Sequence, residues 1–264
     1  MKYIFITLIL YKSISTFSQS FEINQGEIYI ELNAEDGTLS DSIQKVVISN
    51  KEIRNYNKLF ILNAHNQLPA FIRKLDWMKE VTLVGVYKPH NGDTVIANFI
   101  ISDEFNQFNS LKHLTFYAVG IKEVKSNFKI NSLDSLAVIY DIIETIPKPF
   151  FGCQNIEKLI LSRNKIKEIP KEISSLKKLI TLNLFSNELK IIPEELFSVT
   201  SLRYVFLDSN EIELISDAIC QLKNLNNLSA TGNPIISVPA CIYSMQNLRW
   251  FGVDLDGASF GDNN

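Results

Sequence analysis

The sequence of 264 residues contains only three cysteines, three histidines, ten glycines and eight prolines. So few cysteines exclude a small fold held together by several disulfides, and so little glycine and proline excludes collagen-like and low-complexity chains. The formal charge is −3, which is too little positive charge for a nucleic-acid-binding surface. Because 46% of the residues are apolar and 21% are charged, we expect a folded protein with a sizeable core.

An apolar run near the N-terminus predicts a secretory signal. Met1 and Lys2 precede the run 3–11, and a serine-rich stretch then offers small residues for a signal-peptidase cut. This run covers less than half of the roughly 20 residues that a membrane-spanning helix needs, and no later stretch is long enough. We therefore expect residues 1–20 to be removed, the protein to reach the periplasm, cell surface or medium, and no stable membrane insertion.

The C-terminal half of the chain repeats itself every 23 residues. Aliphatic side chains dominate three columns of the repeat, at positions one, four and six. The first of these columns contains Ile156, Leu179, Leu202, Leu225 and Leu248. Asparagine occupies position nine in four successive units: Asn164, Asn187, Asn210 and Asn233. An apolar residue, then usually a proline, and then two further apolar residues complete each unit.

These columns resemble the leucine-rich repeat, L-x-x-L-x-L-x-x-N-x-L, in the 23-residue variety whose second half reads L/I-P-x-x-I/L. The resemblance implies an α/β-type solenoid, a horseshoe with a parallel β-sheet on its concave face. Mostly irregular or short helical segments would then form the convex face.

The physical chemistry of one coil explains the recurring residue types. A single coil has an apolar interior that only its neighbours can cover, so the coils must stack to be stable. The chain turns inward at the asparagine, whose amide carries both donors and acceptors for backbone groups left open in a buried turn. Proline fixes φ and removes an N–H, which suits a segment that crosses to the outer surface without joining a sheet.

The same template weakens towards the N-terminus and predicts the organisation of the chain. We expect a solenoid over residues 58–253, degenerate over 58–155 and regular over 156–253, with Asp141 and Val119 at two asparagine positions. Ten surplus residues near Pro89–Asp93 predict a protruding hairpin. Residues 21–57 predict an N-terminal β cap, with strands around Ile28–Leu32 and Val46–Ile48, and 254–264 a polar tail.

The three cysteines fall at or beside core positions of the repeat. Cys153 occupies a core position, whereas Cys220 and Cys241 flank core residues of adjacent coils. The simplest interpretation is that all three are small buried hydrophobic residues. A bridge between Cys220 and Cys241 stays open, but it needs Cα atoms within about 7 Å, and the outer side of a curved solenoid spreads its coils apart.

No catalytic motif emerges from the sequence. The histidines His65, His90 and His113 lie in no zinc-binding, nucleophile-elbow or phosphate-loop pattern. The acidic residues of the repeat fall at outward positions, where a solvated surface is the ordinary explanation. We therefore expect a protein that is not an enzyme and that holds neither a cofactor nor a metal.

Outward positions of the strands carry large side chains on the expected concave face. Aromatic and apolar rings there are costly to leave in water, and arginines flank them, as in interface hot spots. The alternative is that the rings pack on one another and only stabilise the sheet. The predicted partner-binding residues are Ile160, Arg163, Phe185, Tyr204, Phe206, Asp208, Arg249 and Trp250.

Two functional hypotheses follow. The first is an exported recognition module that binds a protein or peptide on the concave sheet. The second is a structural or surface-adhesive component that recognises glycan or the cell envelope, with the hairpin near Asn91 as a possible contact.

Overall fold

The computed structural model describes residues 20–25, 27–32, 40–62, 64, 68–85 and 99–254. The predicted signal up to residue 19, the predicted hairpin around Pro89–Asp93 and the tail from residue 255 lie outside the described residues. In the described part, no helix is long and apolar enough to cross a membrane.

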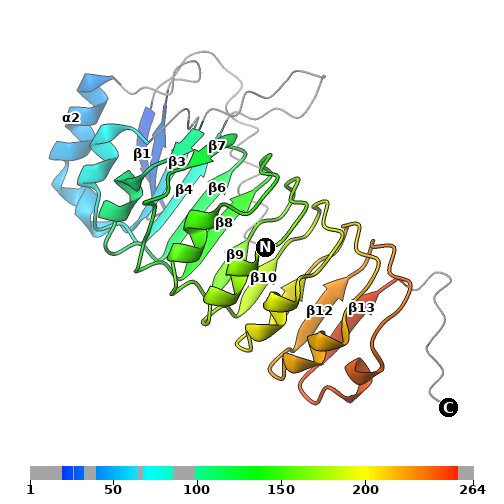
Figure 1. Ribbon diagram of the computed structural model, residues 1–264. Helices are drawn as coiled ribbons and strands as arrows, with labels where there is room; N and C mark the ends of the chain where they lie inside the picture. Colours follow the sequence, from blue (N-terminus) through cyan, green and yellow to red (C-terminus); the bar gives the residue numbers. More distant parts are fainter. Residues whose placement is uncertain are drawn as a thin grey trace, which may run out of the picture.

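One long sheet runs through the described chain, and each coil adds one strand to it (Figure 1). Neighbouring strands are parallel except for the first pair, in which β1 (Ser20–Asn24) and β2 (Glu27–Glu31) form an antiparallel hairpin at the N-terminal edge. The other strands, in spatial order, are β3 (Lys58–Leu62), β4 (Glu80–Val84), β6 (His113–Tyr117), β8 (Ser135–Ile139), β9 (Lys158–Ile160), β10 (Thr181–Asn183), β11 (Tyr204–Phe206), β12 (Asn227–Ala230) and β13 (Trp250–Val253).

The strand register confirms the predicted fold. The position-four residues pair across the sheet in one line: Leu159, Leu182, Val205, Leu228 and Phe251. Their side chains point into the solenoid, and the first four are buried. The residues on either side of position four point out of the sheet, because successive strand side chains alternate.

Short 3-10 helices lie on the opposite, convex side of the coils (Figure 1). Proline caps most of those in the regular repeat, and its carbonyl oxygen accepts a hydrogen bond from the third residue after it, as in Pro170–Ile173 at 3.0 Å. Ser216 replaces proline in one coil, and its Oγ accepts a hydrogen bond from the Ala218 N–H. The five helices are η4 (Lys148–Gly152), η5 (Lys171–Ser175), η6 (Glu194–Ser198), η7 (Asp217–Gln221) and η8 (Ala240–Ser244).

Phenylalanine fills the core of the degenerate coils, which are less regular than those that follow. Phe105 makes an edge contact with Phe116, and Phe128 another with Phe150, with ring centroids 5.5 and 5.8 Å apart. These rings are buried and belong to the same continuous core as the aliphatic columns of the regular coils. The connections here hold η2 (Ala70–Lys74), η3 (Asp103–Gln107) and a separate parallel pair, β5 (Phe99–Ile101) with β7 (Ile121–Val124).

The N-terminal segment differs in one respect from the sequence prediction. Ile28 and Ile30 lie in β2 as expected, but Val46–Ile48 belongs to helix α2 (Asp41–Ser49), so the predicted second strand is wrong. Val47 is buried and Ile43 packs against the core, four residues apart on one helical face, whereas Ile48 is exposed. A spacing of four residues is typical of a helix, but the consecutive apolar residues Val46–Ile48 suggested a strand. The short helix η1 (Lys51–Asn55) follows.

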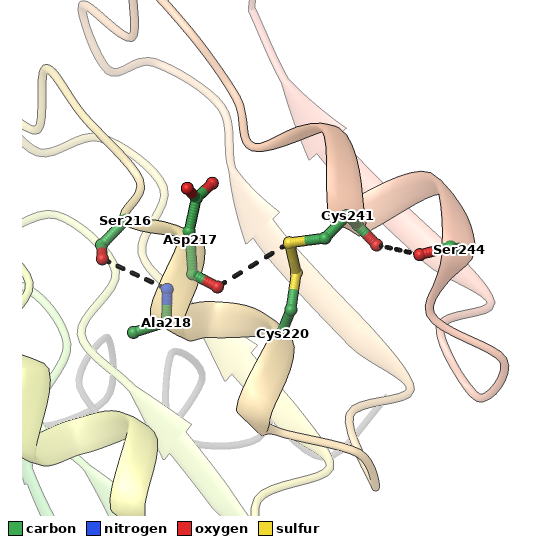
Figure 2. Close-up of a disulfide and its surroundings, with 6 residues drawn as sticks. All are labelled: Ser216, Asp217, Ala218, Cys220, Cys241 and Ser244. Carbon is green, nitrogen blue, oxygen red and sulfur yellow. Dashed lines mark hydrogen bonds between the residues drawn. A yellow bond between two sulfur atoms is a disulfide. The ribbon is translucent and has the colours of Figure 1, made fainter.

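A disulfide joins Cys220 to Cys241, so the interpretation of these two as buried free thiols is wrong (Figure 2). The Cα atoms are 6.2 Å apart, because η7 and η8 stack closely instead of spreading. Cys220 directly follows the core residue Ile219, and Cys241 directly precedes the core residue Ile242. The Cys241 Sγ lies 3.7 Å from the Asp217 carbonyl oxygen. Cys153 is free and buried, as expected, and its Sγ accepts a hydrogen bond from the Ile130 N–H.

We predict that this disulfide stabilises the last two described coils. It closes a loop with a sequence separation of 21, which corresponds to about 3 kcal/mol in the chain-entropy model. The double variant Cys220→Ser/Cys241→Ser should unfold at lower denaturant concentration and exchange the amide protons of β12 and β13 faster. Reductant should lower the stability of the wild type to that of the variant and leave the variant unchanged. Three titratable thiols in the unreduced, unfolded wild type would contradict the bridge.

Candidate binding surface on the concave sheet

The chain leaves each strand through a left-handed turn at position eight. The backbone φ angle is positive there in six successive coils. The residues are Ala118, Tyr140, Arg163, Ser186, Ser209 and Gly232, with φ between 51° and 67°. Only one is glycine, although the region disfavours other residues, so the surrounding contacts must hold the turn in place. The position-eight N–H donates to the next coil, as from Arg163 to the Phe185 carbonyl at 2.7 Å.

The buried asparagine amides connect consecutive coils behind this turn. The Asn187 Nδ2 donates to the carbonyls of Leu161 in the preceding coil and Leu184 in its own, at 2.9 and 3.0 Å. Its Oδ1 accepts from the Ile166 N–H at 3.0 Å. Asn210 and Asn233 repeat all three bonds one and two coils later, and Asn164 makes the two donor bonds. These four amides therefore occupy equivalent corners of one continuous spiral.

Asp141 occupies the same corner with a different set of bonds. Its two carboxylate oxygens accept hydrogen bonds from four backbone N–H groups, those of residues 119, 120, 121 and 142, at 2.8–3.2 Å. Burial raises the pKa of this carboxyl, and the four N–H donors oppose part of that rise. The preceding coil presents three N–H groups here, whereas it presents one carbonyl and one N–H to Asn187, so an acceptor-only side chain fits.

The outward side chains form rows across the strands, which we number by their repeat position. Row three contains Lys158, Thr181, Tyr204, Asn227 and Trp250, and row five contains Ile160, Asn183, Phe206, Ser229 and Gly252. Row seven, just past the strands, includes Phe185 and Asp208. Ile160, Phe185, Tyr204, Phe206 and Trp250 thus share one face. Tyr204 and Phe206 lie on the same strand, β11, and Trp250 lies two strands further on.

Tyr204 and Trp250 are the most exposed rings on this face, at 40% and 47% of their full surface. The Trp250 indole lies over Gly252 in the same strand, because a Cβ on that glycine would stand 2.3 Å from the ring atom Cη2. A glycine at this place therefore leaves room for the six-membered ring of the indole, and part of the side chain stays exposed to solvent.

Arg163 lies between two aromatic rings at the ends of the strands. Its guanidinium carbon is 5.4 Å from the ring centroid of Tyr140 and 5.7 Å from that of Phe185. Tyr140 in turn stacks on Tyr117, with centroids 6.1 Å apart. The four side chains form a row across four coils, here called the arginine–aromatic row. Cation–π contacts hold the guanidinium, and no carboxylate in the described part pairs with it.

Two of the predicted residues are placed differently from the rest. The Asp208 Oδ1 accepts hydrogen bonds from the Thr231 N–H and Oγ1 at 3.1 and 2.6 Å, and from the Ser229 hydroxyl. These bonds tie two coils together and use one carboxylate oxygen. Arg249 precedes β13 and is exposed, and its backbone N–H donates to the Asn226 carbonyl.

An aromatic pair that was not predicted from the sequence lies at the other end of row five. Tyr29 and Phe60 stack with their centroids 5.0 Å apart, and the Tyr29 hydroxyl donates to Glu27 at 2.6 Å. Lys58 forms ion pairs with Glu27 and Glu80 beside them. The signal in the sequence is that Tyr29 and Phe60 each stand between two aliphatic residues, which predicts outward positions in β2 and β3. Among the described residues, no cluster of His, Cys, Asp or Glu could hold a metal ion.

Comparison with known proteins supports this architecture. Residues 131–189 match the family model described as the leucine rich repeat. A leucine-rich repeat protein of Leptospira interrogans is similar in structure, with a TM-score of 0.64 and 26% identity over 87% of this chain. Residues 131–189 thus carry the leucine rich repeat, and the described chain has the fold of leucine-rich repeat proteins. It spans only 57% of the Leptospira chain.

Two further solved structures share the fold. The plant peptide hormone receptor RGFR1, solved in complex with RGF2, has a TM-score of 0.52 and 19% identity, covering 84% of this chain and 37% of its own. The leucine-rich repeat domain of the type III effector XopL has a TM-score of 0.57 and 15% identity, covering 80% of each chain. No curated protein matches the sequence.

We predict that Asn and Asp cannot be exchanged at position nine. Asn187→Asp would set a carboxylate against the Leu161 and Leu184 carbonyls, and Asp141→Asn would set an amide N–H₂ against backbone donors. Each change leaves buried polar groups unsatisfied and should cost about 2–4 kcal/mol in free energy of unfolding. Urea denaturation at neutral pH measures both. Asn131→Asp, at an exposed side chain, is the control, with an expected effect below about 0.5 kcal/mol. An Asp141→Asn variant as stable as the wild type would refute this account of the corner.

Proposed function

We propose that this chain is an exported, non-enzymatic recognition module that binds a protein or peptide on its concave sheet. One observation carries the proposal: exposed aromatic rings and Arg163 lie on the same face of the sheet. Arg163 contacts two rings and pairs with no carboxylate of the described part. Leucine-rich repeat folds are typically recognition modules, which agrees with this choice.

A bound partner would bury these aromatic rings more than they bury one another. None of Phe185, Tyr204, Phe206 and Trp250 is in ring-to-ring contact with another aromatic side chain in the described part. Mutual packing of these rings therefore does not account for their presence. Covering an exposed Tyr or Trp at the centre of an interface is worth about 2 kcal/mol or more.

Arg163 supplies the polar contact of the proposed interface. Its two cation–π neighbours fix the side chain, so little rotamer entropy is lost when its N–H groups bind a partner. The arginine–aromatic row would thus anchor one end of a ligand while Phe206 and Trp250 bury the other. An extended peptide is a suitable ligand, because the rows run across several coils. The plant peptide hormone receptor RGFR1, solved in complex with RGF2, shares the fold and supports this choice of ligand.

Export is part of the proposal. The Cys220–Cys241 disulfide favours an oxidising compartment, because cytosolic thiols are kept reduced. The predicted signal in residues 1–20 agrees with this, and the final compartment would be the periplasm, the cell surface or the medium.

We predict that Phe206→Ala/Trp250→Ala abolishes capture of a partner from an extract of the native host. Both substitutions remove outward side chains, so the fold should persist and binding should weaken at least about 100-fold. Tyr243→Ala is the matched control, because Tyr243 is 64% exposed on the convex side. Affinity capture followed by mass spectrometry measures the result. Equal capture by the double variant and the control would reject the concave surface.

Glycan recognition is the second candidate, and the Trp250 ring favours it. An indole that packs over Gly252 and is 47% exposed is a suitable platform for the apolar side of a sugar ring. The predicted hairpin near Asn91, the other proposed contact, lies outside the described residues.

A glycan array distinguishes the two candidates. If the chain binds glycan, wild-type protein should label specific glycans, and Trp250→Ala and Gly252→Val should both lose them, because valine displaces the ring. Tyr243→Ala should keep the labelling. An array without signal for a protein that still captures a polypeptide partner would exclude the glycan function.

A further inference from the structure

A small pocket lies on the convex side of the N-terminal coils, away from the concave sheet. It has a volume of about 240 Å³ and is formed by the end of α2, by η1, and by the segment from Lys74 to Trp77 that ends η2. Figure 1 shows α2 and its neighbouring turns at this end of the sheet. Ile48, Ile53, Leu75 and Trp77 supply apolar lining.

The aromatic wall of this pocket is held in place. The Trp77 Nε1–H donates to the Tyr56 carbonyl oxygen at 3.0 Å, and the side chain packs against the core. The Arg54 guanidinium carbon lies 4.7 Å from the Trp77 ring centroid. One ring and one cation are therefore pre-oriented at the pocket, which reduces the entropy lost on binding.

All charged residues that line the pocket are basic. They are Lys51, Arg54 and Lys74, and no carboxylate joins them. The ion pairs found in the described part involve other cations, including the neighbouring Arg73, which pairs with Glu104. The acidic neighbours Glu52 and Asp76 are exposed and lie outside the lining. Three cations without an acid are notable in a chain whose net charge is −3.

We propose that this pocket binds a small amphipathic organic anion, a single ring that carries a phosphate or carboxylate group. The ring would pack against Trp77 and Ile48, and the anionic group would accept hydrogen bonds from Arg54 and the two lysines. The volume is below that of most pockets for drug-sized ligands, which restricts the ligand to about one ring. This site is independent of the concave surface.

Phenyl phosphate is the probe, and Trp77 is the reporter. The chain has two tryptophans, so Trp250→Phe leaves Trp77 as the only one. Titration of this full-length variant should give a saturable change in tryptophan fluorescence, matched by isothermal calorimetry on the wild type. Inorganic phosphate tests the charge alone and benzyl alcohol the ring alone, and each should bind at least about ten-fold more weakly.

Charge-removing variants test whether binding occurs in this pocket. Lys51→Gln/Lys74→Gln keeps the Arg54–Trp77 contact and the fold, because both lysines are exposed, and it should weaken phenyl phosphate binding at least about ten-fold. Lys125→Gln/Lys190→Gln, two exposed lysines elsewhere, should leave binding unchanged. The proposal is overturned if calorimetry and fluorescence show no saturable binding, if inorganic phosphate binds as tightly as phenyl phosphate, or if the pocket variant binds like the wild type.

Discussion

One buried amide in each regular coil holds this solenoid in register. A chain that leaves a parallel strand and turns into the core exposes carbonyl oxygens where no water can reach them, and each such group costs about 1–3 kcal/mol if unsatisfied. The Asn187 Nδ2 satisfies carbonyls of two coils at once, and its Oδ1 returns a bond to the preceding coil. A shift of the repeat by one residue would break these bonds throughout the column, so the amides set the spacing of everything that the coils display.

The concave surface follows from that spacing. Since position nine is fixed inside, position eight takes a left-handed backbone, even at Tyr140 and Arg163. This turn places both side chains at the strand ends, where Tyr140 meets Tyr117 and Arg163 reaches Phe185 of the next coil. The candidate site therefore depends on the turn at positions eight and nine. The turn buries a polar side chain at position nine and places a ring or a guanidinium at the surface at position eight.

The C-terminal end of the described solenoid is held by different means. Leu248, Phe251 and Val253 are only partly buried, because no further described coil covers them. The Asp254 Oδ2 accepts a hydrogen bond from the Gly232 N–H at 2.6 Å, and the disulfide ties η7 to η8. These contacts hold the last described coils together beside the strand that carries Trp250.

The 23-residue period made the fold predictable from the sequence. Features that depart from the period were not predictable in the same way. The 23-residue columns predicted the strand register from β8 onward, because every coil repeats one solution. The disulfide was not predictable with certainty, since Cys220 and Cys241 occupy different repeat positions and meet only through the stacking of η7 on η8. Asp141 breaks the asparagine column because the shorter preceding coil turns its N–H groups inward. The Arg163 contacts depend on a left-handed turn that no repeat motif records.

The concave sheet can be tested most directly by photo-cross-linking from matched positions. A benzophenone amino acid replaces one exposed tyrosine in each of two variants. One variant carries it at position 204, on row three of the concave sheet, and the other at position 243, on the convex side. After irradiation in an extract of the native host, the concave-surface account predicts one dominant cross-linked polypeptide from position 204 and none from position 243. Cross-linking of the same polypeptide from position 243 alone would contradict it.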